Sequence, residues 1–115
     1  MNVYLICPVR CADLAVLERC AAYVECLERD GHTVHYPPRD VDQGDTTGLG
    51  ICDAHLRAME AADEVHVAWD VESKGSHFDL GMAFALRKDI RRVFTVHADT
   101  PGKSYWKVMG ELNVR

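Results

Sequence analysis

Short apolar runs alternate along the chain with longer segments in which apolar residues recur at helical spacing. Residues 3–6 form a nearly continuous apolar run before Cys7-Pro8, a pattern that is typical of a buried parallel strand. Apolar residues then recur every three or four positions from Leu14 to Leu27, and Asp30-Gly31 is a typical end of a helix. This part of the chain therefore predicts a strand followed by a helix.

The same alternation continues along the rest of the chain. It predicts strands over residues 33–36, 64–69 and 92–96, helices over 51–62 and 76–87, and a short helix or edge strand from Ser104. Residues 37–50 are rich in Pro, Asp, Gly and Thr, and a loop of this length is expected to be mobile or functional. The order predicts one domain over residues 1–115, a flavodoxin-like or Rossmann-like three-layer α/β sandwich with a parallel sheet of four to five strands and helices on both faces.

Ligands of such sheets bind beyond the carboxyl ends of the strands. The predicted loops at that edge carry many polar side chains, namely Arg10, Asp13, Arg39, Asp40, Asp70, Ser73, Ser76, His77 and His97. We therefore expect the functional site there. Tyr4 and Trp69, in two of the predicted strands, belong either to the core or to a surface that stacks on a flat base.

Composition narrows the class of protein. The 48% of hydrophobic and 27% of charged residues are typical of a soluble globular protein, and no apolar run approaches the roughly 20 residues of a membrane span. A net charge of -5 argues against a nucleic-acid-binding surface, and the basic run at 87–92 is expected to complement the end of a helix. Five cysteines without a CxxC pair, and no predicted secretory signal, favour reduced thiols in a cytoplasmic protein.

Asp79 lies in the first turn of the predicted helix over 76–87. Ser76 and Asp79 fit the S-x-x-[DE] pattern of a capping box, in which each side chain accepts from the other's backbone N–H. A carboxylate near a helix N-terminus is also favoured in its charged form, which a nucleophile needs. Gly75-Ser76 before a helix can bind an anion through backbone N–H groups. Position alone favours the cap.

Other chemistries have weaker patterns. The six histidines form no HExxH motif and no paired spacing with the cysteines, so no metal site is predicted. A serine hydrolase is disfavoured because the sequence has no GxSxG elbow. Cys7, directly after the first strand, is either a nucleophile or a buried thiol, and buried thiols are commoner.

Three segments in order resemble the nucleoside 2-deoxyribosyltransferase-like family, which includes nucleotide N-glycosidases. They are VYLICPVR at 3–10, ICDAHLRAMEAADEVHVAWD at 51–70 and SKGSHFDLGMAFALRKDI at 73–90. The resemblance implies an enzyme that cleaves the bond between a sugar's anomeric carbon and a nucleobase through a carboxylate nucleophile, as retaining glycosidases do. It also implies a homodimer or larger homo-oligomer, without a metal or cofactor, in which the segment 111–113 could reach a partner's site.

The resemblance also implies roles for single residues. The family's catalytic Glu falls on Asp79, Asp53 handles the base or its proton, and Tyr4 orients Asp79 or the sugar. Substrate contacts are expected from Cys7, Pro8, Arg10, Arg39, Asp70, Ser73, Gly75 and Ser76. Ser73 replaces a family acid and Lys74 lies beside it, which favours a nucleoside 5'-monophosphate whose phosphate meets Ser76 and the two arginines.

Two departures from the family pattern leave alternatives open. Asp79 is shorter than Glu by one C–C bond of about 1.5 Å, and a misplacement of about 1 Å can cost on the order of a hundredfold in rate. The first alternative is therefore a nucleotide-binding module with weak or no catalysis. An Asp-based hydrolase or sensor is a third hypothesis, but it needs acids and a divalent metal where the sequence has Cys7-Pro-Val-Arg10.

Overall fold

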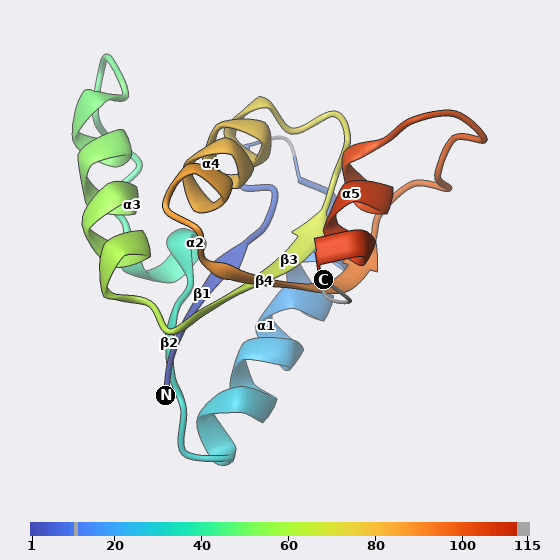
Figure 1. Cartoon of the computed structure of the whole chain (residues 1–115). Coiled ribbons are helices and arrows are strands. Elements are labelled where there is room, and N and C mark those ends of the chain that lie inside the picture. The colour runs from blue at the N-terminus through green and yellow to red at the C-terminus, as the bar shows by residue number, and fades with distance from the viewer. Residues whose placement is uncertain (11, 113–115) are drawn as a thin grey trace.

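Four parallel strands form the central sheet of the computed structural model, which describes residues 1–10 and 12–112 (Figure 1). They are β1 (Asn2–Ile6), β2 (Thr33–His35), β3 (Glu64–Trp69) and β4 (Asp89–Thr95), in the order β2-β1-β3-β4. Each neighbouring pair is parallel. The predicted alternation and the parallel sheet are confirmed, and β1 and β3 are its central strands.

Helices cover both faces of this sheet (Figure 1). One face packs against α1 (Leu14–Arg29), and the other packs against α3 (Leu49–Ala61), α4 (Lys74–Ala85) and α5 (Tyr105–Leu112). A single turn, α2 (Pro37–Asp40), follows β2. The three-layer architecture is therefore confirmed for the described residues. None of their helices is both long and apolar enough to cross a membrane.

The side chains of β1 divide between the two cores because successive residues of a strand point to opposite faces. Val3 and Leu5 pack towards α1, whereas Tyr4 and Ile6 pack towards α3 and α4, and all four are 2% exposed or less. Burying an aliphatic side chain of this size stabilises a fold by about 1.5–3 kcal/mol. Tyr4 thus reaches the same layer as α4, the helix that carries Asp79.

The predicted capping box is wrong, because α4 begins at Lys74 rather than at Ser76. Ser73 is the N-cap, and its Oγ accepts from the backbone N–H of Ser76 at 3.2 Å. Asp79 consequently lies in the second turn of the helix and faces the sheet, where its carboxylate meets side chains instead of backbone N–H groups.

Three further boundaries differ from the prediction. The long loop is interrupted by α2 and ends earlier, because the Asp45 carboxylate accepts from the backbone N–H groups of Gly50 (2.6 Å) and Ile51 (3.3 Å) at the start of α3. β4 begins at Asp89 rather than at Arg92, whereas the tail after Ser104 is helical, which is one of the two predicted forms. In α1, Leu14 is 68% exposed, so the buried face of this helix starts further along.

The basic run after α4 complements a different helix from the one predicted. Lys88 Nζ donates to the carbonyls of Glu60 (3.0 Å) and Ala62 (2.9 Å), which lie at the C-terminus of α3. Arg91 pairs instead with Asp89 at 2.8 Å. A lysine thus ties α3 to the start of β4 and compensates two carbonyl groups that lack helical partners.

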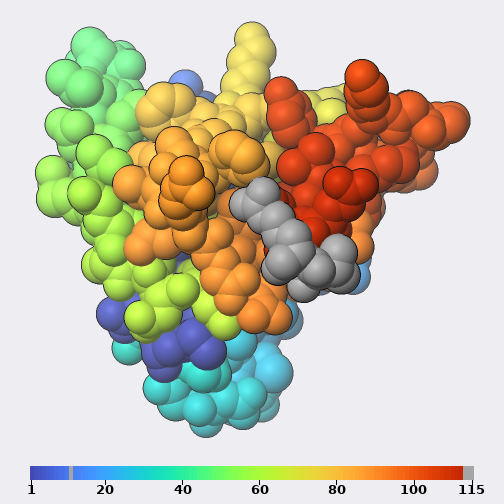
Figure 2. Space-filling view, viewed as in Figure 1, coloured from blue at the N-terminus to red at the C-terminus, as the bar shows by residue number. Residues whose placement is uncertain are grey.

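The outer surface of α4 is unusually apolar. Figure 2 shows this face of the molecule, with α4 lying between α3 and α5. Phe78 and Phe84 are 56% and 53% exposed, although the opposite side of the helix buries Leu80 and Ala83 in the core. This helix is therefore apolar on two sides.

Candidate functional site

A cleft of about 460 Å³ lies beside Asp79 at the carboxyl end of β1. Its walls come from the segment after β1, from the loop before α3 and from α3 itself, and from the segment that leads into α4. The lining residues are Cys7, Val9, Arg10, Gln43, Gly48, Ile51, Cys52, His55, Glu72, Ser73, Lys74, Gly75, Ser76 and Asp79. This is the edge at which the sequence predicts a site, and we call it the Asp79 cleft.

The Asp79 carboxylate is held through both of its oxygens. Oδ2 accepts from the Tyr4 hydroxyl at 2.9 Å, and Oδ1 lies 3.1 Å from Nδ1 of His55. Asp79 is only 5% exposed, so little water competes for these oxygens. The carboxylate therefore has a fixed orientation at the wall of the cleft.

Tyr4 supports Asp79 from inside the core. Its ring is fully buried and stacks on His35, with ring centroids 5.0 Å apart and planes 29° apart. Burial, the Asp79 charge and the hydrogen bond to Asp79 raise the pKa of Tyr4 well above its usual value. The hydroxyl consequently keeps its proton and remains a hydrogen-bond donor to Asp79.

His55 is the site residue that the sequence did not indicate. It lies on α3 between Ile51 and Met59, so helical spacing turns it towards the sheet, and its side chain is 12% exposed. If Nδ1 donates to Asp79, Nε2 of the neutral ring is an acceptor. This Nε2 is buried and has no hydrogen-bond partner among the described residues.

The mouth of the cleft suits an anion. Ser76 is 2% exposed, and its Oγ also has no hydrogen-bond partner among the described residues. The N-terminus of α4 contributes backbone N–H groups and the positive end of the helix dipole. Open space lies where a side chain of Gly75 would be, and Arg10 and Lys74 add positive charge to the lining.

Five of the predicted site residues do not line this cleft, and one of them, Tyr4, lies behind Asp79 and contacts it from the core. Asp53 is exposed on α3, two positions before His55 and on another side of the helix. Arg39 is held by Glu28 at 2.9 Å and by Asp40 at 2.8 Å. The other two are Pro8, which is buried, and Asp70, whose carboxylate accepts from the backbone N–H of Glu72 at 2.9 Å. Cys7, Arg10, Ser73, Gly75, Ser76 and Asp79 do come together in the lining.

Cys7 lies in the cleft as a protonated thiol. A hydrogen bond with the Cys20 thiol, burial and the charge of Asp79 all raise the pKa of Cys7. Since the thiolate is the nucleophilic form of cysteine, Cys7 is poorly suited to attack a substrate. The cysteines of the described residues, Cys7, Cys20, Cys26 and Cys52, are free.

Potential metal ligands gather beside the Asp79 cleft, and one of them, Glu72, also lines it. One atom each from Asp70, Glu72 and His97 lie within 4.8 Å of one another. Nε2 of His97 lies 3.4 Å from Asp70 and 3.7 Å from Glu72, and His97 and Glu72 are both exposed.

Comparison of the sequence with protein-family models and with curated proteins gives no match. Solved structures do match. The CMP N-glycosidase of Clostridium botulinum has a TM-score of 0.67 and 16% identity, over 98% of this chain and 84% of that chain. The 2-deoxyribosyltransferase of Bacillus psychrosaccharolyticus has a TM-score of 0.68 and 17% identity, over 97% and 96%. The likeness confirms the predicted fold, and both enzymes are of the kind that the three sequence segments resemble.

The Tyr4–Asp79 hydrogen bond can be tested through stability. Tyr4→Phe removes the donor from a buried carboxylate, so we expect the free energy of unfolding to fall by about 1.5–3 kcal/mol. Urea unfolding measures this change. Tyr23→Phe is the matched control, because Tyr23 bonds His66 in a partly exposed position on the α1 side, and it should cost less. Equal midpoints for wild type and Tyr4→Phe would show that the bond contributes nothing.

His35 gives a pH-dependent prediction. Burial lowers its pKa, and the charge of Asp40 only partly opposes this. Below the usual histidine pKa of about 6.5, the unfolded chain therefore binds a proton that the folded chain does not. Stability contributed by neutral His35 is present above that pH and is lost as the pH falls towards the lowered pKa.

When the pH falls from about 7 to about 5, we expect the melting temperature of His35→Gln to decrease less than that of the wild type. His97→Gln, which removes an exposed histidine, is the control for the substitution itself. An unchanged pH dependence in His35→Gln would contradict the prediction.

Proposed function

We propose that this protein cleaves or transfers the N-glycosidic bond of a nucleoside 5'-monophosphate, with Asp79 as nucleophile. One observation carries the proposal: a buried carboxylate, fixed by Tyr4 and His55, lies in a cleft that also contains an anion-binding helix terminus. A sugar phosphate places its anomeric carbon and its 5'-phosphate at opposite ends of one ring. The cleft offers the Asp79 carboxylate for the anomeric carbon and the N-terminus of α4 for the phosphate.

In the proposed reaction, a lone pair of Asp79 forms a bond to the anomeric carbon while the bond from that carbon to the base nitrogen breaks. The base leaves with the electron pair of that bond and gains a proton. Water or a second base then attacks the same carbon and releases Asp79. Tyr4 and His55 hold the carboxylate in place, which lowers the entropic cost of reaching the transition state.

His55 is proposed to take the acid/base role that the resemblance gives to Asp53. The reason is placement: His55 touches Asp79, whereas Asp53 is exposed and does not line the cleft. With its unpaired Nε2, His55 can also accept or deliver a proton inside the cleft. The role of Asp53 remains a prediction from the resemblance.

Ser76 and the first turn of α4 are the proposed phosphate contacts. The proposal is supported by the Ser76 hydroxyl, which has no hydrogen-bond partner among the described residues, and by the charges that Arg10 and Lys74 add to the lining. The similar structure from Clostridium botulinum is a CMP N-glycosidase, and CMP is a monophosphate, which supports a monophosphate over a free nucleoside. Arg39 is not proposed here because Glu28 and Asp40 already bind it.

A nucleotide-binding module without efficient catalysis is the second candidate function. Both Asp79 oxygens already have hydrogen-bond partners, and the side chain is shorter than a glutamate. A carboxylate held in this way can also bind a sugar hydroxyl without attacking the anomeric carbon. The two functions share one cleft and differ only in whether a bond breaks.

One experiment separates them. Ribo- and deoxyribonucleosides and their 5'-monophosphates are incubated with the protein, and released base is measured by chromatography. We expect release from a monophosphate, its loss in Asp79→Asn, and its retention in Asp30→Asn, an exposed acid at the end of α1. Ser76→Ala should raise KM more for the monophosphate than for the nucleoside.

Other outcomes are equally informative. If no substrate releases base above the Asp79→Asn level while a monophosphate raises the melting temperature, the binding function replaces the enzymatic one. If neither base release nor a thermal shift is found, the site assignment itself fails. Release that is lost in Asp53→Asn but kept in His55→Gln would return the supporting role to Asp53.

We also propose a homodimer formed through α4, because Phe78 and Phe84 expose a large apolar surface on its outer side. Sedimentation velocity should show a dimer that Phe84→Glu dissociates, and a wild-type monomer would contradict the proposal.

Asn113, in the segment predicted to reach a partner's site, lies outside the described residues. The cytoplasmic location remains a prediction from the cysteines.

A further inference from the structure

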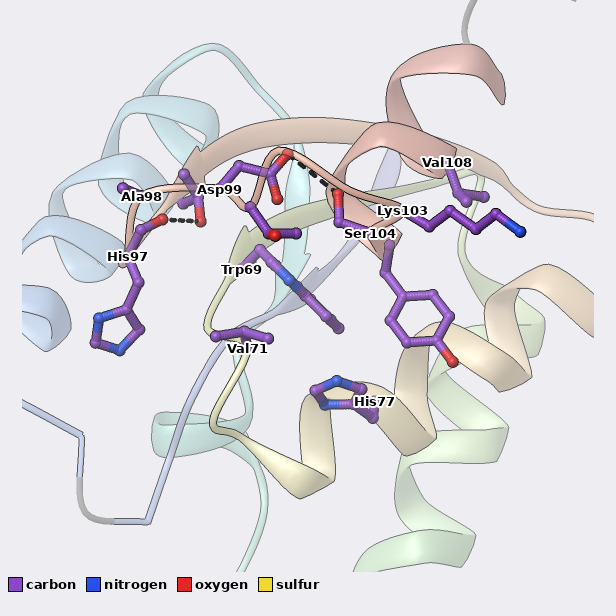
Figure 3. Close-up of a pocket in the computed structure, with 12 residues that line it drawn as sticks. Trp69, Val71, His77, His97, Ala98, Asp99, Lys103, Ser104 and Val108 are labelled. Carbon is purple, nitrogen blue, oxygen red and sulfur yellow. Dashed lines mark hydrogen bonds between the residues drawn. The ribbon is translucent and has the colours of Figure 1, made fainter.

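A second cavity, of about 550 Å³, lies near the carboxyl ends of β3 and β4 (Figure 3). Trp69 at the end of β3, His77 in α4, the segment 95–104 and the first turns of α5 surround it, and we call it the Trp69 cavity. It shares no lining residue with the Asp79 cleft. The two hollows use consecutive residues of α4, because Ser76 lines the cleft and His77 lines the cavity.

Three aromatic rings form one wall of the Trp69 cavity. The ring centroid of His77 lies 4.7 Å from that of Trp69 and 5.5 Å from that of Tyr105, and Trp69 and Tyr105 are 6.2 Å apart. Tyr105 is 56% exposed, so part of its ring is uncovered. Aromatic side chains stack on flat base rings with a gain of about 1–3 kcal/mol per base, and they tolerate different bases.

The three rings also carry hydrogen-bonding groups that can pair with the nitrogen and oxygen atoms at the edge of a heterocycle. Nδ1 of His77 lies 2.7 Å from the carbonyl oxygen of Ser73 and must carry the proton of that bond, which leaves Nε2 of the neutral ring as an acceptor. Among the residues drawn in Figure 3, side chains form hydrogen bonds from Thr95 to the carbonyl of His97 and from Ser104 to Asp99, and neither bond involves Trp69 or Tyr105. The indole N–H of Trp69 and the hydroxyl of Tyr105 are therefore not bonded to another wall residue.

The segment before α5 forms the opposite wall. Hydrogen bonds hold it in place, and its acid, Asp99, is paired with a lysine. Lys107 pairs with Asp99 at 3.1 Å and also donates to the carbonyls of Thr100 and Gly102, which ties the segment before α5 in place. Asp99 accepts in addition from Ser104 at 3.1 Å. A wall fixed before binding avoids part of the entropic cost of association. The carboxylate of this wall is already paired, and Lys103, which also lines the cavity, adds a positive charge.

We propose that the Trp69 cavity binds a flat heteroaromatic ring of the nucleobase class, at a site separate from the Asp79 cleft. The ring stacks against the aromatic wall, and its nitrogen and oxygen atoms meet His77, Tyr105 and the indole N–H of Trp69. The volume is in the range of small-molecule sites, about 300–1,000 Å³. The proposal does not depend on catalysis in the cleft.

The test uses the fluorescence of Trp69. Trp69 and Trp106 are the two tryptophans of the chain, so in Trp106→Phe the emission comes from Trp69 alone. This variant is titrated with adenine, cytosine, their nucleosides and their 5'-monophosphates. We expect a saturable change with a free base, and a Kd raised about tenfold or more by Tyr105→Ala because a stacking partner is lost. Tyr105→Phe, the matched control, keeps the ring and should lose less.

Variants of the cleft decide where the probe binds. Asp79→Asn and Ser76→Ala should leave the titration with free base unchanged, even if the protein releases no base from any substrate. No saturable change with any probe overturns the proposal, as does a Kd that Tyr105→Ala leaves unaltered. Binding of monophosphates alone, abolished by Ser76→Ala, would place the ligand in the cleft and also overturn it. If Trp106→Phe does not fold, calorimetric titration of the Tyr105, Asp79 and Ser76 variants with native Trp106 compares the same Kd values.

Discussion

The hydrogen bond between Tyr4 and Asp79 connects the centre of the sheet to the helix on which both hollows depend. Neither group can turn to water, because Tyr4 is fully buried and Asp79 almost so. A buried hydroxyl or carboxylate without a partner is costly, so the rotation of α4 about its own axis is fixed by this contact. That rotation directs Ser76 into the Asp79 cleft and His77 into the Trp69 cavity.

The sequence predicted the fold well where burial decides local structure. The run Glu64–Trp69 was predicted with its observed limits, because its apolar residues, Val65 and those at 67–69, are all buried in the core. The start of α4 was placed too late, since Ser73 and Ser76 are both acceptable N-caps and only the tertiary contacts of Asp79 choose between them. The resulting change of three positions in the N-cap separates a capping carboxylate from one that faces the sheet.

The candidate site was predictable only in part, because sequence spacing does not show which way a side chain points between two packed elements. Asp53 and His55 are two positions apart on α3, and the packing of Met59 against the sheet turns His55 inwards and Asp53 outwards. Arg39 was predicted as a phosphate contact because it lies near a loop at the correct edge. Its bonds to Glu28, Asp40 and the Val34 carbonyl come from three segments that no local pattern connects.

The position of β4 at the end of the strand order has a consequence for solubility. An edge strand presents unpaired backbone groups to which another chain can add. Here the first residues of that edge include Asp89, Arg91 and Arg92, and the register between β3 and β4 shifts after Val67. Charge and a local irregularity of this kind both oppose growth of the sheet from one molecule to the next. The chain can therefore carry an apolar helix on its surface while its most aggregation-prone backbone stays protected from fibril-like pairing.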